Sequence, residues 1–68
     1  MISVIIAAFN AAVTIDRCIS SIDIAKKNHE IELIVIDDGS NDDTARLLHR
    51  WESDRAWVTV KYQKNGGL

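Results

Sequence analysis

Residues 32–48 of the chain read ELIVIDDGSNDDTARLL. A run of apolar residues rich in Ile stops at two adjacent carboxylates, Asp37 and Asp38, and Gly39 and a helical pattern follow. The apolar run predicts a strand over residues 31–36 that is buried on both faces, as in a parallel sheet. Two like charges at its end cost stability unless they cap a helix or meet a ligand. This junction is therefore the first candidate for a functional site.

The segments on either side alternate between strand and helix patterns. Residues 2–8 are a second apolar run, whereas apolar residues in 13–27 recur at helical spacing, with Thr14 as the expected N-cap and Cys18 in the apolar stripe. Trp51 is the expected packing anchor of the second helix. In order, we expect a strand over 2–8, a helix over 13–27, a strand over 31–36, a helix capped by Ser40 or Asn41, and a strand over 57–63.

This β-α-β-α-β order predicts an α/β fold with a parallel sheet and helices covering its faces. In doubly wound sheets of this kind, ligands bind outside the carboxyl ends of the strands. Several polar and glycine residues are expected at that edge, namely Asn10, Asp37, Asp38, Gly39 and the turn Asn65-Gly66-Gly67. Gly39 is expected to supply a positive φ or a close backbone approach.

Composition limits the classes of protein that the chain can belong to. Its 68 residues form at most one small domain, and 47% hydrophobic with 26% charged residues is a globular composition. A net charge of -2 without a basic patch argues against nucleic acid as a partner. Cys18 is the only cysteine, which rules out an internal disulfide and is compatible with a reducing cytosol. No run reaches the ~18 apolar residues that would span a bilayer, and no positively charged leader precedes Arg17.

Two common nucleotide-binding patterns are absent. A dinucleotide fold needs a glycine-rich turn after its first strand, but that turn here reads AAFNAAVT over residues 7–14. A phosphate-binding loop of the Walker type needs GKS or GKT, which occurs nowhere in the chain. The carboxylates at the end of the second strand therefore belong to another kind of site, or they cap the following helix and bind water.

Three motifs in order are similar to the start of the family 2 glycosyltransferases of GT-A fold. SVIIAAFN at 3–10, LIVIDDGSNDDT at 33–44 and QKNGGL at 63–68 resemble the family's SVIIPxYN, its acidic-acidic-Gly-Ser motif and its NGG turn. The resemblance runs through the whole chain. It implies that residues 1–68 are the N-terminal, Rossmann-like half of a nucleotide-diphospho-sugar transferase domain.

The resemblance also implies roles for individual residues in donor binding. Ala7, Ala8 and Phe9 would line the pocket for base and ribose. Asp38 would accept a hydrogen bond from the imide nitrogen of uracil or thymine, and Asp37 would support the loop or lie near the ribose. The remaining members of the expected site are Asn10, Gly39, Gly66 and Gly67.

Two positions depart from the family pattern, since Ala7 replaces the usual proline and Phe9 the usual tyrosine. The family's metal-binding Asp-x-Asp and its catalytic base do not occur in these residues, and Asp42-Asp43 is not that motif because its carboxylates are adjacent. We therefore expect no catalytic residue, metal site or cofactor in this chain, no activity of the chain alone, and Mn²⁺ or Mg²⁺ in a full-length enzyme.

The resemblance implies a UDP- or dTDP-sugar as partner and a role in cell-surface polysaccharide biosynthesis. A cytoplasmic location is expected, and association with the inner face of the membrane through other regions stays open. The alternatives are a non-catalytic nucleotide-binding or self-assembling α/β module, and a truncated product without activity. The isolated chain is expected to self-associate, because its first strand would lack a neighbour on one side.

Overall fold

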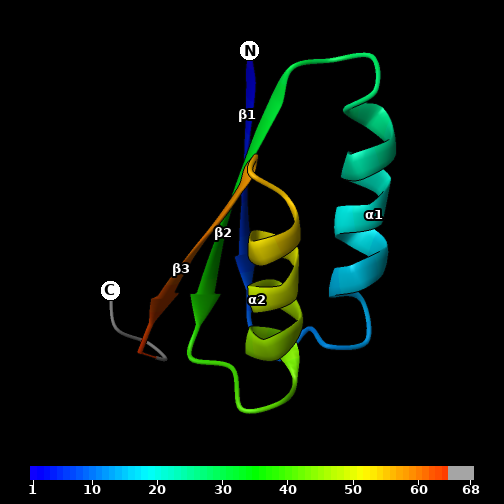
Figure 1. Cartoon of the computed structure of the whole chain (residues 1–68). Helices are drawn as coiled ribbons and strands as arrows, with labels where there is room; N and C mark the ends of the chain where they lie inside the picture. Colours follow the sequence, from blue (N-terminus) through cyan, green and yellow to red (C-terminus); the bar gives the residue numbers. More distant parts are fainter. Residues whose placement is uncertain (65–68) are drawn as a thin grey trace.

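The computed structural model describes residues 1–64 and has the expected order of elements (Figure 1). These are strand β1 (Ile2–Ala8), helix α1 (Ile15–Ala25), strand β2 (Ile31–Asp38), helix α2 (Thr44–Asp54) and strand β3 (Val58–Gln63). The expected turn that contains Gly66 and Gly67 lies outside the described residues. The fold class predicted from the alternating patterns is confirmed.

The three strands form a parallel sheet in the order β1-β2-β3, and all three run in the same direction (Figure 1). Ala8 of β1 is the register partner of Asp37, and Asp38 is the partner of Gln63 of β3. The carboxyl ends of the strands therefore meet at one edge of the sheet, where both connections to the helices begin.

Both helices lie on the same face of the sheet (Figure 1). Successive strands are added in one direction and parallel crossovers share one hand, so α1 and α2 must fall on the same side. The prediction that the strands are buried on both faces is wrong for the described residues, because burial alternates along β1 and β2. Ile5, on the uncovered face, is 67% exposed.

The core lies between this covered face and the two helices. Leu33 of β2, Ile19 of α1 and Leu48 of α2 are fully buried within it. Cys18, expected in the core, is exposed. A helix advances about 100° per residue, so Cys18 lies at the margin of the stripe that Ile15 and Ile19 direct inward. The cluster comprises Ala8, Ile15, Ile19, Leu33, Val35, Leu48, Val58 and Val60, with Trp51 packed against it as predicted.

The outer edges of β1 and β3 differ. On β3, the backbone N–H of Val60 points away from β2 and donates to Glu52 Oε2 at 2.8 Å, so a side chain of α2 covers this edge. On β1, Ile2 N–H bonds Glu30 O on the β2 side, and the alternating groups of Ser3, Ile5 and Ala7 face outward. These outward groups have no hydrogen-bond partner within residues 1–64, so β1 has an open edge there.

Candidate functional site

The structure brings the predicted site residues of the first two strands to one edge. Ala7 and Ala8 end β1 and lie beside the end of β2, where Asp37 and Asp38 are the last two residues. Phe9 follows β1 and is 48% exposed. Asn10 lies in the connection from β1 to α1 and Gly39 begins the connection from β2 to α2, while Gly66 and Gly67 lie outside the described residues.

The two adjacent carboxylates point to opposite faces of the sheet and have different partners. Asp37 faces the helices and is 2% exposed, and its Oδ1 accepts hydrogen bonds from the N–H of Ser40, at 3.2 Å, and from the Ser40 hydroxyl. Asp37 therefore holds the turn that follows β2, but it does not cap the following helix, because its bonds end at Ser40 and α2 begins only at Thr44.

Asp38 lies on the uncovered face and is half-buried. Its Oδ1 accepts a hydrogen bond of 3.3 Å from Gln63 Nε2, and no hydrogen bond within residues 1–64 reaches Oδ2. One carboxylate oxygen is therefore available to a donor group of a ligand at the carboxyl edge.

The first loop (residues 9–14) contains Asn10, whose φ of 48° is left-handed. Its N–H donates to Ser40 Oγ at 2.9 Å, and its Oδ1 accepts from Asn41 N–H at 2.7 Å. Asn10 thus joins the first loop to the connection between β2 and α2, rather than forming only a local turn. The expected positive φ at Gly39 is confirmed, with a value of 70°.

A second connection joins the first loop to the start of α2. The hydroxyl of Thr44, a fully buried residue, accepts from Ala11 N–H at 2.7 Å and donates to Asp42 Oδ1. Asp42 Oδ2 accepts from Ala12 N–H at 3.3 Å, and Oδ1 also accepts from Thr44 N–H at 2.9 Å. We call this pair, Asp42 and Thr44, the clasp.

The clasp corrects the predicted start of the second helix. The expected caps were Ser40 or Asn41, but α2 begins at Thr44 and Asp43 holds the N-cap position without a side-chain bond. Asp42 supplies the capping carboxylate instead. Asp42 thus belongs to the start of α2 and also bonds the first loop, a contact that the sequence pattern does not indicate.

The clasp also perturbs the acidity of its carboxylate. Hydrogen bonds from the Thr44 hydroxyl and the Thr44 N–H hold the pKa of Asp42 below its ordinary value of 3.8. These bonds stabilise the ionised form in the folded state, so the unfolded state binds a proton more readily than the folded one.

This pKa shift predicts a pH-dependent contribution to stability. A lowered pKa in the folded state contributes stability that is fully present above the unfolded value of 3.8 and is lost as pH falls through the lower folded pKa. Asp42→Asn should therefore be less stable than wild type at neutral pH, and the difference should shrink as pH falls below 3.8. Urea unfolding followed by circular dichroism at several pH values measures this.

Asp43→Asn is the matched control, because Asp43 makes only an exposed ion pair with Arg46 and such pairs contribute little. A difference between wild type and Asp42→Asn that stays constant from neutral to acidic pH would contradict the assignment.

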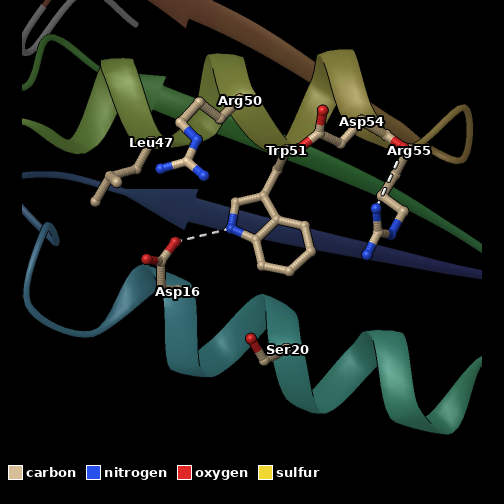
Figure 2. A pocket seen from close by; sticks show the side chains of 7 residues that line it. All are labelled: Asp16, Ser20, Leu47, Arg50, Trp51, Asp54 and Arg55. Atoms are coloured by element: carbon tan, nitrogen blue, oxygen red, sulfur yellow. Dashed lines mark hydrogen bonds between the residues drawn. The ribbon is translucent and has the colours of Figure 1, made fainter.

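A hollow of about 210 Å³ lies between the two helices, apart from the carboxyl edge (Figure 2). The Trp51 indole crosses it, and its Nε1–H donates to Asp16 Oδ1 at 2.8 Å. Arg55 lies 5.5 Å from the centroid of the Trp51 ring and pairs with Asp23. These groups satisfy one another, and ligand pockets usually occupy at least about 300 Å³. We therefore interpret the hollow as part of the packing contact between the two helices and not as a ligand pocket.

Within residues 1–64, no three His, Cys, Asp or Glu side chains are grouped closely enough to hold a metal ion. Asp37 and Asp38 could not chelate one ion together, since they face opposite sides of the sheet. No helix in the described part of the chain is long and apolar enough to cross a membrane.

Comparison with known proteins supports a single family. The model of glycosyl transferase family 2 matches residues 3–68. The chain is 33% identical over 66 residues to the poly-beta-1,6-N-acetyl-D-glucosamine synthase of Staphylococcus aureus strain COL, covering 97% of this chain and 16% of that protein. It is 34% identical over 68 residues to a chondroitin synthase of Escherichia coli, covering all of this chain and 10% of that protein. The chain thus spans a small part of the length of these relatives.

Proposed function

Because the chain belongs to the family 2 glycosyltransferases, we propose that it forms the nucleotide-binding part of an enzyme that transfers a sugar from a nucleotide-diphosphate-sugar to an acceptor. The donor nucleotide would lie at the carboxyl edge, against Ala7, Ala8, Phe9 and Asn10 on one side and the end of β2 on the other. The names of the relatives favour synthesis of a polysaccharide as the process that the transfer serves.

The proposed contact with the nucleotide base is made by Asp38. A half-buried carboxylate at the strand end, with one oxygen unengaged within residues 1–64, is suited to accept a hydrogen bond from the imide N–H of uracil or thymine. Asp37 has a different role, since its carboxylate is buried and engaged by Ser40. It would support the loop and make no contact with the base. Gly39 would allow the backbone to turn away from the ligand.

Asp38→Ala tests this assignment. Hydrogen bonds to a charged group contribute about 1.5–3 kcal/mol, so the substitution should weaken UDP binding by about tenfold or more. Isothermal titration calorimetry with UDP and CDP measures the effect. Cytosine lacks the imide N–H, so wild type should prefer UDP, and Asp38→Ala should lose that preference.

Asp43→Ala is the control and should bind UDP as wild type does, because Asp43 lies at the start of α2 and its carboxylate pairs with Arg46. Equal UDP affinities of wild type and Asp38→Ala would overturn the assignment of Asp38.

The remaining parts of the reaction are proposed to lie outside these residues. A divalent ion such as Mn²⁺ or Mg²⁺ would neutralise charge on the donor diphosphate, but the described carboxylates do not fit such an ion. We therefore expect the chain alone to bind a nucleotide without transferring a sugar. A cytoplasmic location is part of the same proposal.

We also propose that the isolated chain self-associates through β1. The outward N–H and C=O groups of Ser3, Ile5 and Ala7 lack partners within residues 1–64, whereas Glu52 covers the edge of β3 at Val60. A second copy paired along β1 would satisfy these groups.

A further inference from the structure

Thr44 is excluded from direct contact with a ligand by its own bonds. It is fully buried, and its hydroxyl accepts from Ala11 N–H while donating to Asp42 Oδ1. A hydroxyl has one proton to donate, and that proton is already used. Thr44 can therefore influence a ligand only indirectly, and its bond from Ala11 N–H points to the first loop as the route.

The first loop has few other restraints at this point. The parallel ladder between β1 and β2 ends at Ala8 and Asp37, so Phe9 and the residues after it have no ladder bonds. Beyond its local turn into α1, the loop is tied to the rest of the fold by two sets of bonds. In the first set, Asn10 N–H donates to Ser40 and Asn10 Oδ1 accepts from Asn41 N–H. In the second set, the clasp accepts hydrogen bonds from the N–H groups of Ala11 and Ala12.

We propose that Thr44 and Asp42 are positioning residues for the nucleotide, which keep the first loop at a fixed spacing from the end of β2. This inference rests on the proposed function, because it assumes that Phe9 and Asp38 face the same nucleotide. Holding both sides of the site in the bound arrangement lowers the ordering cost of binding. The specificity for the base then depends on residues that never touch it.

Two substitutions of Thr44 separate the hydroxyl from the volume it fills. Thr44→Val keeps the shape and removes both hydrogen bonds, whereas Thr44→Ser keeps the hydroxyl. Substitutions without ligand contact change coupling to a site by factors of about 3- to 30-fold. We expect Thr44→Val to weaken UDP binding within that range and Thr44→Ser to stay within about twofold of wild type, because the bonds persist.

Amide hydrogen exchange by NMR reports whether the clasp has opened. In Thr44→Val, the Ala11 N–H should lose protection, while N–H groups of the β1–β2 ladder should keep theirs. Asp42→Ala is the second variant. Its side chain is exposed, so this variant should fold even if Thr44→Val does not, and it should expose Ala12 N–H and weaken UDP binding in the same direction.

The ratio of UDP to CDP affinity separates positioning from a loss of folded protein. Partial unfolding lowers both affinities by the same factor and leaves their ratio unchanged, whereas a displaced loop should reduce the preference for UDP. Unchanged UDP affinity and ratio in a Thr44→Val variant whose Ala11 N–H has lost protection would overturn the inference. Retained protection of the Ala11 N–H in Thr44→Val would also overturn the inference. Wild type without a preference for UDP would instead contradict the proposed function.

Discussion

Leu33→Ala is expected to leave the chain largely unfolded in water. Leu33 is fully buried in β2, the central strand of the sheet, in the same cluster as Ile19 of α1 and Leu48 of α2. Removing a buried leucine side chain costs about 2–5 kcal/mol through lost burial and the remaining cavity. A domain of this size rarely has more than about 3–5 kcal/mol of stability from its core, so one substitution consumes most of it.

Urea unfolding followed by far-UV circular dichroism measures this effect, and Ile34→Ala is the matched control. Ile34 is the next residue of β2, but it lies half-buried on the uncovered face and outside the core cluster. Its truncation should therefore shift the midpoint much less. If the two variants unfolded at the same urea concentration, both faces of β2 would be equally important and the one-sided core would be wrong.

The order of the elements could be predicted because apolar periodicity changes from strand to helix and back along the chain. Whether helices cover one face of the sheet or both could not be predicted. An apolar strand such as β1 has the same sequence pattern whether or not its second face is covered, and Ile5 is in fact exposed. The prediction that Cys18 is buried was wrong for a related reason, since the width of the buried stripe on α1 depends on what packs against it.

The grouping of the candidate residues was predicted from the sequence, but most of their hydrogen bonds were not. Strand ends in a parallel sheet must meet, so the grouping of Asn10, Asp37 and Asp38 followed from the topology. The bonds from Ala11 to Thr44 and from Asn10 to Ser40 join residues about thirty positions apart, with side chains common in any helix start. No local pattern distinguishes a cap that serves its own helix from one that also holds a neighbouring loop.

Ile5→Lys is expected to convert a self-associating chain into a monomer. β1 contains no charged residue, and Ser3, Ile5 and Ala7 direct outward backbone groups that are unpaired within residues 1–64. In an antiparallel pair of β1 strands centred on Ile5, the two lysine side chains would lie directly opposite one another, and like charges in that position oppose pairing. Light scattering at micromolar concentration should give wild type a mass of at least twice the 7.6 kDa of one chain, and Ile5→Lys the mass of one chain.

Thr59→Lys distinguishes the edge of β1 from the uncovered face of the sheet. Thr59 is exposed on β3, and its position in the strand places its side chain on the same face as Ile5. If copies pair along the β1 edge, Thr59→Lys should stay associated, since Glu52 already protects the β3 edge at Val60. If both variants became monomers, the copies would instead be packing face to face. A monomeric wild type would mean that the exposed groups of β1 are satisfied by water alone, and self-association through this strand would be wrong.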